Sequence, residues 1–345
     1  MVMQAEAILA QGRNVRFNLR SRRGANVDTM PTVEDVIRLE EDWDRAHTPF
    51  DQTANLPAFQ YVTSKDAGSS LVRLGGYGER YELAEHAHDQ FLSKMDYGQR
   101  LWSRSSDQMN ALHLNYLVQN DKERDVMLRI QDGNTVRAML GSGYANFDTL
   151  EFLQMVQPFL QGGRVRMAYD DNMTFHMQVT FPSQQVAIKV GDIVETGFYL
   201  RNSPVGISSV TLAGLIWRLR CTNGLVSADR GNGLFRFRHT GDRGKLQDAV
   251  RLAIEQSHVD TQTMVGKFKE AVDKAIADPA SKLEAITKDN NLSQADFKDF
   301  INHMMEEPDP TLFGVVNAIT ATARDRQGEE SYNLSRIALR VLVNS

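Results

Sequence analysis

The feature that most constrains the fold is a change in the hydrophobic period along the chain. Between residues 164 and 238 apolar residues alternate with polar ones, whereas on either side they recur at intervals of three and four. The alternating segments are rich in β-branched and aromatic residues, and turn sequences such as Asp170-Asp171-Asn172 and Ser203-Pro204 separate them. This pattern predicts a largely antiparallel sheet with helical segments before and after it.

The helical segments have recognisable beginnings and ends. Pro31 precedes an amphipathic pattern over residues 33–43, and two further amphipathic helices are expected between residues 81 and 120. An apolar stripe over residues 246–276 predicts a long helix directly after the sheet. We therefore expect an α+β fold with a central, curved antiparallel sheet flanked by amphipathic helices, a long helix after the sheet and a helical C-terminal part.

The length of 345 residues corresponds to about two domains of ordinary size. We expect an N-terminal region over residues 1–79, which contains one helix and a basic arm with five arginines between residues 11 and 24. A core of helices and antiparallel sheet is expected over residues 80–245, and a helical part over residues 246–345. Two short strands around Asp132-Gly133-Asn134 predict a hairpin inside the core.

Composition excludes several classes of protein. The chain has 41% hydrophobic and 24% charged residues and a net charge of −5, which excludes collagenous and wholly disordered chains. No apolar run approaches the roughly 18 residues that a membrane-spanning helix needs, and the first residues lack the pattern of a secretory signal. The single cysteine, Cys221, cannot form an intrachain disulfide or a cysteine-rich zinc site. We therefore expect a cytoplasmic protein that does not contact membranes.

A two-residue arginine pattern recurs in the alternating region. Three pairs of arginines are each separated by one apolar residue, and strand geometry places both members of such a pair on one face. Residues 164–245 contain 11 basic and six acidic residues, so this region carries +5 and the remainder carries −10. The pattern predicts a nucleic-acid-binding face composed of Arg164, Arg166, Arg201, Arg218, Arg220, Arg236 and Arg238. A solvated sheet face whose arginines pair with acidic helices is the alternative interpretation.

Signatures of catalysis are scarce. The chain contains none of the short motifs of zinc proteases, serine hydrolases, P-loop proteins or dinucleotide-binding folds. Asp170, Asp171 and His176 could bind a divalent ion, but aspartates at a turn also favour local hydrogen bonds. We therefore expect no catalytic residue, no resident metal and no cofactor.

Two polar segments are interpreted as structural turns. The segment from Asn202 to Gly206 separates two strand segments and makes them a candidate hairpin. The segment from Cys221 to Gly224 follows an apolar strand and ends in Asn-Gly, which is a tight-turn sequence. Structural roles are therefore assigned to Asn202, Cys221, Asn223 and Gly224.

These two segments also carry a family resemblance. The sequence Gly197–Gly206 followed by Arg218–Gly224 resembles the signature of the phage- and plasmid-borne proteins called domain of unknown function 932. Val136–Tyr144 resembles an upstream strand of that family, although Leu140-Gly141 stands where the family usually has Leu-Ser. The resemblance covers residues 80–340. It implies a phage, plasmid or other mobile-element setting in a bacterial host, and it supplies neither an activity nor catalytic residues.

Three functional hypotheses follow. The expected plan of curved sheet, basic strand face and following helix is similar to that of single-strand annealing recombination proteins, which form rings or filaments around single-stranded DNA. The first hypothesis is therefore a homo-oligomeric protein that binds nucleic acid, single-stranded DNA in particular, in recombination or replication without covalent chemistry. The second is a self-assembling protein of the virion or of host takeover that binds no nucleic acid. The third is a metal-dependent nuclease that uses Asp170, Asp171 or His176.

Overall fold

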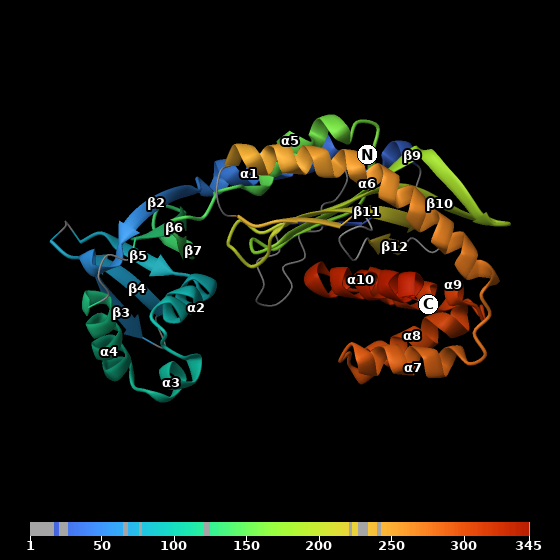
Figure 1. Cartoon of the computed structure of the whole chain (residues 1–345). Coiled ribbons are helices and arrows are strands. Elements are labelled where there is room, and N and C mark those ends of the chain that lie inside the picture. Colours follow the sequence, from blue (N-terminus) through green and yellow to red (C-terminus); the bar gives the residue numbers. More distant parts are fainter. Residues whose placement is uncertain are drawn as a thin grey trace.

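The computed structural model of the chain has the shape of an arch, in which a long sheet and a long helix connect two lobes (Figure 1). It describes residues 17–20, 27–64, 68–75, 78–120, 125–220, 223–226, 234–239 and 243–344. Most of the expected basic arm and Cys221 lie outside the described residues. Helices and two β-sheets make up the described chain, which confirms the predicted α+β class.

The first lobe, residues 50–141, contains a six-stranded sheet with the order β2-β6-β7-β5-β4-β3. Its neighbouring strands are antiparallel except for β5 and β7, which are parallel. The strands are β2 (Phe50–Asn55), β3 (Phe59–Ser64), β4 (Gly68–Arg73), β5 (Arg80–Leu83), β6 (Asp125–Gln131) and β7 (Thr135–Gly141), and the helices are η2 (Leu56–Ala58), α2 (Glu85–Lys94), α3 (Gln99–Arg104) and α4 (Asp107–Asn120). The predicted hairpin is β6–β7, and Asp132 and Gly133 at its turn adopt the positive φ angles that this sequence favours.

A second, seven-stranded antiparallel sheet forms the beam of the arch. Its order is β1-β8-β9-β10-β11-β12, and β13 pairs with β11 beside β12. The strands are β1 (Phe17–Arg20), β8 (Arg164–Asp170), β9 (Phe175–Lys189), β10 (Asp192–Asn202), β11 (Val210–Arg218), β12 (Asn223–Val226) and β13 (Leu234–Phe237). Register shifts in the β8–β9 and β9–β10 pairs mark irregularities of the kind that bend a sheet. The beam is the predicted curved antiparallel sheet.

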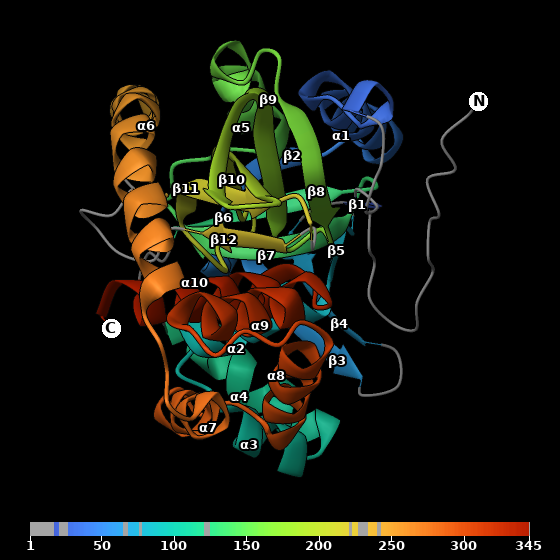
Figure 2. The same cartoon turned by 90° about the vertical axis from the view of Figure 1, so that its right-hand side faces the viewer.

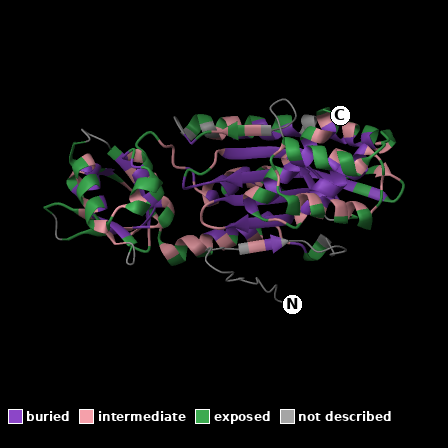
Figure 3. Ribbon diagram, turned by 90° about the horizontal axis from the view of Figure 1, so that it is seen from below, coloured by how far each residue is buried: buried purple, intermediate pink, exposed green. Residues whose placement is uncertain are grey.

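Helices cover both faces of the beam (Figure 2). Before and after the strands lie η1 (Val27–Thr29), α1 (Val33–His47), α5 (Thr149–Val156), η3 (Gln157–Phe159) and the expected long helix α6 (Arg243–Asp273). The outer face packs against α1, α5 and α6 in one apolar cluster that includes Val36, Phe152, Phe198 and Ile254. The opposite face, called the inner face below, carries Tyr199 and packs against Tyr332 of α10. Burial on both faces leaves the strands of the beam mostly inaccessible to solvent (Figure 3).

The second lobe consists of the C-terminal helices. They are α7 (Pro279–Asp289), α8 (Gln294–Glu306), α9 (Leu312–Arg324) and α10 (Gly328–Asn344). Nearly all of α9 is buried, and its Phe313 shares a core with Phe268 of α6 and Ile216 of the beam. The C-terminal helices and the beam therefore share one hydrophobic core. Within the part of the chain that the structure describes, no helix is long and apolar enough to cross a membrane.

Two details differ from the sequence prediction. The boundary expected between residues 79 and 80 falls inside one sheet, because β5 pairs with β4 on one side and with β7 on the other. Residues Asn223 and Gly224 form the start of β12 and pair with β11, so the turn precedes them. A Cβ at Gly224 would lie 2.9 Å from the Gln178 Oε1 atom and 3.1 Å from the Trp217 ring. Close packing therefore explains this glycine, whereas the prediction had assigned it to a tight turn.

Candidate nucleic-acid interface and a charged pocket

The seven candidate arginines do not share one face of the sheet. Three of them, Arg166, Arg201 and Arg218, are buried with at most 8% of their surface exposed. The β10–β11 register pairs Arg201 with Thr211 and Val194 with Arg218. Residues 201 and 194 are an odd number of positions apart, so Arg201 and Arg218 point to opposite faces.

Two of the three pairs fail for a local reason. A register shift between Val165 and Met167 interrupts the alternation in β8, and Arg220 lies beyond the end of β11. More generally, helices cover most of both faces of the beam, so most of its described strand residues are buried. The expected common basic face is therefore wrong.

Each buried arginine has a carboxylate partner. The Arg166 guanidinium forms an ion pair with Glu195, and its Nε donates to the Thr180 Oγ1 at 2.8 Å. The Arg218 Nε donates to Asp192 Oδ1 at 2.8 Å, and its Nη1 donates to Glu307 Oε2 at 2.7 Å. These contacts neutralise the buried charge, as burial requires. They also occupy the donors that a phosphate would need.

The remaining candidates differ in exposure. Arg164 is half-buried and its Nη1 donates to the Gly163 carbonyl oxygen at 3.1 Å. Arg220, Arg236 and Arg238 are exposed. Among the described residues, no carboxylate lies within ion-pair distance of Arg236 or Arg238. These two side chains therefore keep donors available for an external anion.

Arg236 belongs to a polar row that crosses the inner face. The strand register aligns Tyr169, His176, Arg201, Thr211 and Arg236 on four neighbouring pairs of strands. Residues aligned in this way project from the same face of a sheet. The row thus brings together Arg201 and Arg236, which the sequence had placed in one site.

Helix α10 completes this group, and its three contributing residues were not singled out from the sequence. The Tyr332 ring stacks on Tyr199 with centroids 4.8 Å apart, and the Arg236 Nη2 donates to the Tyr332 hydroxyl at 3.3 Å. The guanidinium carbons of Arg201 and Arg336 lie 5.0 Å and 5.5 Å from the centre of the same ring. The Arg201 Nε also donates to Glu329 Oε1 at 2.7 Å. We call Arg201, Arg236, Glu329, Tyr332 and Arg336 the inner-face cluster.

His176 lies behind the inner-face cluster. Its Nδ1 is 2.5 Å from the Tyr199 hydroxyl oxygen, and its Nε2 is 3.6 Å from Glu329 Oε1. Burial, together with the nearby positive charge of Arg201, lowers the pKa of His176 to about 3. The imidazole is therefore neutral at physiological pH. Burial likewise raises the pKa of Tyr199 well above its ordinary value, so its hydroxyl stays protonated.

The two aspartates considered for metal binding stabilise a turn. Asp170 Oδ1 accepts the Asn172 backbone N–H at 2.7 Å, and Asp171 Oδ1 accepts the Met173 and Thr174 backbone N–H groups at 3.0 Å and 2.8 Å. Within the described residues, no group of three or more His, Cys, Asp or Glu side chains is arranged to hold a metal ion. The geometry therefore gives these aspartates the structural role that was the alternative to a metal site.

The turn after β10 connects the beam to the first lobe. Its carbonyl oxygens accept from first-lobe side chains: the Arg129 Nη1 reaches Pro204 at 2.6 Å, and the Gln90 Nε2 reaches Val205 at 2.9 Å. Arg129 is itself buried and pairs with Asp51 and Asp148 at 2.8 Å and 2.7 Å. Preceding the turn, the Asn202 Nδ2 donates to the Phe147 carbonyl at 3.0 Å. The main-chain carbonyls of this turn therefore help to fix the junction between the beam and the first lobe, and Asn202 ties the end of β10 to the segment before α5.

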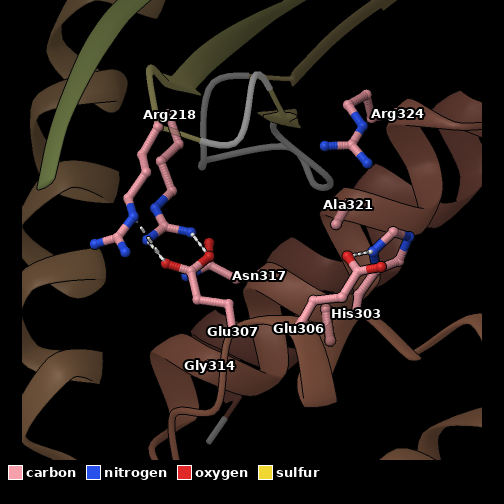
Figure 4. Close-up of a pocket in the computed structure, with 10 residues that line it drawn as sticks. Arg218, His303, Glu306, Glu307, Gly314, Asn317, Ala321 and Arg324 are labelled. Atoms are coloured by element: carbon pink, nitrogen blue, oxygen red, sulfur yellow. Dashed lines mark hydrogen bonds and ion pairs between the residues drawn. The ribbon is translucent and has the colours of Figure 1, made fainter. Parts of the chain in front are cut away.

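A separate pocket of about 270 Å³ lies where the end of β11 meets α8 and α9 (Figure 4). We call it the α8–α9 pocket. The sheet contributes Arg218 and Arg220, while the helices contribute charged residues and a row of small ones. The lining residues are Arg218, Arg220, His303, Glu306, Glu307, Gly314, Asn317, Ala318, Ala321 and Arg324. The structure thus brings Arg218 and Arg220 together here, far along the chain from the helical residues that face them.

Comparison with known proteins assigns a family. The model of the family described as Domain of unknown function (DUF932) matches residues 138–333, which is more than half of the chain. The chain belongs to this family. The matched DUF932 region begins in β7 and ends in the first turns of α10, so it includes strands β8 to β13 of the beam, the turn after β10, the α8–α9 pocket and the inner-face cluster except for Arg336. It is shorter than the expected range of 80–340, and most of the first lobe lies before it. Searches of curated proteins and of solved structures found no match.

Proposed function

We propose that the protein binds single-stranded nucleic acid, DNA in particular, through Arg236 of the inner-face cluster and through Arg238, in recombination or replication of a mobile element. The observation that carries the proposal is the exposure of Arg236 and Arg238. Arg236 contacts Tyr332, and the guanidinium groups of Arg201 and Arg336 lie near the same ring. Arginines of this kind contact phosphates and also stack on bases. The proposed activity involves no covalent chemistry.

The surrounding charge supports the same assignment. Residues 164–245 carry +5 in a chain whose net charge is −5, and three buried arginines of that region are neutralised internally. The net positive charge available to a ligand therefore depends on the exposed arginines, among them Arg236 and Arg238. The similarity in plan to single-strand annealing proteins supports the proposal by analogy only.

Salt dependence tests the proposal directly. We expect the logarithm of the affinity for a fluorescent single-stranded DNA to fall linearly with the logarithm of the salt concentration. Replacing both arginines in Arg236→Gln/Arg238→Gln should reduce the slope by about 1.4, since each phosphate contact on a single strand contributes about 0.7. The matched control is Arg100→Gln/Arg104→Gln, which removes two exposed arginines from α3 in the first lobe. Equal slopes for the two double variants would contradict the proposal, as would a wild-type protein that shows no salt-dependent binding.

Self-assembly is the second candidate, and α4 favours it. Met109, Leu112 and Tyr116 are 54%, 67% and 63% exposed and recur at intervals of three and four on one face of this helix. No Asp, Glu, Lys or Arg occurs between Gln108 and Asn120. Contiguous exposed apolar side chains are typical of protein contacts, and a face without charge can meet a second copy of itself without repulsion. We propose that this face mediates homo-oligomerisation, which is compatible with nucleic-acid binding elsewhere on the chain.

A further inference from the structure

The α8–α9 pocket has a charge distribution that leaves one arginine available to a ligand. Arg218 is held by Asp192 and Glu307, and the Arg324 Nε donates to Asp325 Oδ1 at 2.8 Å. Arg220 differs, because its side chain is 53% exposed and its Nε lies 3.4 Å from a Glu307 oxygen that Arg218 already binds. Among the residues that the structure describes, no acceptor binds its Nη groups, so their donors are available to an anion at the mouth of the pocket.

The carboxylates around the pocket make their shorter contacts with Arg218 and His303. Glu307 accepts from both Nη atoms of Arg218, at 2.7 Å and 2.6 Å. Glu306 lies 3.2 Å from the His303 Nδ1, and His303 also contacts Asp325 through its Nε2 at 3.0 Å. These two acidic contacts raise the pKa of His303, because they stabilise its protonated form. The lining has three arginines and two glutamates, and Asp192 and Asp325 bind lining residues from outside it, so these charges balance when His303 is protonated. Anion binding here therefore depends on the hydrogen-bond donors of Arg220.

Inside the pocket, one buried polar atom lacks a partner. Asn317 is 8% exposed, it lines the pocket, and its Oδ1 atom forms no hydrogen bond within the described part of the chain. Figure 4 shows Asn317, a residue of α9, beside the Arg218–Glu307 pair. A buried acceptor without a partner is costly, and most native proteins avoid it. Its place in the lining indicates that a ligand supplies the missing donor.

Small side chains give the pocket a flat wall. Gly314, Ala318 and Ala321 follow one another at four and three residues along α9, so they lie on the same side of the helix as Asn317. A planar ring can lie against such a surface. An asparagine amide beside it can pair with the amino group and ring nitrogen of adenine, which is the usual Asn–adenine arrangement.

We propose that the α8–α9 pocket binds a phosphate monoester of nucleotide size, with the phosphate at Arg220 and an amino-bearing ring at Asn317. The pocket volume of about 270 Å³ accommodates one nucleotide. The same chemistry occurs in a free nucleoside monophosphate and in the phosphorylated end of a nucleic-acid strand. This site is distinct from the inner-face cluster, since the two share no residue.

Binding of adenosine monophosphate to the full chain, followed by calorimetry, tests the proposal. We expect Arg220→Gln to weaken binding at least tenfold without changing the melting temperature, because this side chain is exposed. Asn317→Ala should also weaken binding, while its melting temperature stays the same or rises, because the substitution removes an unsatisfied polar atom. Inosine monophosphate, which lacks the amino group, should bind the wild type more weakly than adenosine monophosphate does. The two nucleotides should bind Asn317→Ala with equal affinity.

A second set of measurements identifies the source of the phosphate and separates this site from the proposed nucleic-acid interface. Oligonucleotides with and without a 5′ phosphate are compared on the wild type, Arg220→Gln and Arg236→Gln/Arg238→Gln. A preference for the phosphorylated end that disappears in Arg220→Gln alone supports the pocket and assigns it to strand ends. If neither adenosine monophosphate nor a phosphorylated end binds at millimolar concentration, or if Arg220→Gln binds both as the wild type does, the proposal is wrong.

Discussion

At the scale of single residues, the buried ion pairs explain why arginine-rich strands do not make a basic surface. Arg166 and Glu195 are 3% and 0% exposed and face each other across the beam. Removing one member of such a pair leaves an uncompensated charge in the core, whereas replacing both members by apolar residues restores a neutral core. The loss in free energy of unfolding therefore depends on whether a substitution leaves an unpaired charge in the core.

We expect Glu195→Gln to lower the free energy of unfolding by about 3–5 kcal/mol, because it leaves the Arg166 charge buried without a carboxylate. The double variant Arg166→Met/Glu195→Leu should recover most of this loss. Urea denaturation of the three proteins measures both effects. If the Glu195→Gln protein is as stable as the wild type, Glu195 is not needed to neutralise the buried charge of Arg166.

The burial of His176 predicts how the stability of the protein changes in acid. Burial lowers the pKa of His176 to about 3, while the unfolded chain has an ordinary histidine with a pKa of about 6.5. Stability from this group is therefore complete above pH 6.5 and is lost as the pH falls below it, because only the unfolded state takes up the proton. Between about pH 6 and pH 4 the wild type should lose about 1.4 kcal/mol per pH unit more than His176→Gln. Parallel pH profiles of the two proteins in urea denaturation would exclude this contribution.

At the scale of elements, α4 is the helix whose pattern is least explained by the fold of one chain. Its Leu114 and Val118 pack into the first-lobe core, while Leu112 and Tyr116 project outward. We expect Leu112→Glu to abolish concentration-dependent association in sedimentation velocity, because each copy would bring a like charge to the contact. Met305→Glu, at a side chain that is 71% exposed on α8, is the matched control and should leave association unchanged. Association that survives Leu112→Glu would place the contact elsewhere.

The elements themselves were largely predictable, since their signals are local. Alternation predicted the strands of the beam, the Asp132-Gly133 turn predicted the β6–β7 hairpin, and Pro31 with the pattern after it predicted α1, whose Thr32 and Asp35 form a capping box. Which face a strand residue occupies depends on bulges and on the helices that cover the sheet. Alternation does not encode these, so Arg166 and Arg218 were assigned to a surface although both are buried. The partner of Arg236 lies on α10 and that of Arg220 directly after α8, and the sequence contains no signal that brings such distant residues together.

At the scale of the whole molecule, the first lobe is an insertion in the beam. Residues 17–47 supply β1 and α1 to the beam, residues 50–141 form the six-stranded sheet, and the chain then returns to the beam with α5 and β8. The register pairs Phe17, which precedes the inserted lobe in the sequence, with Asp170, which follows it. The Asp132 backbone N–H donates to the His47 carbonyl at 2.9 Å, close to where the chain enters the lobe. This arrangement explains why a linear division into consecutive regions did not match the structure.

The insertion has a consequence for biosynthesis. A ribosome releases β1 and α1 first, but their partner β8 follows only after the whole inserted lobe has emerged. The six-stranded sheet has all of its strands by residue 141, so it can close while the beam is still incomplete. Arg129 of that sheet has no Pro204 carbonyl to bind until the turn after β10 has been synthesised. The order in which this chain is made is therefore not the order in which its parts become stable, since β1 and α1 are synthesised before the inserted lobe but can pair with β8 only after it.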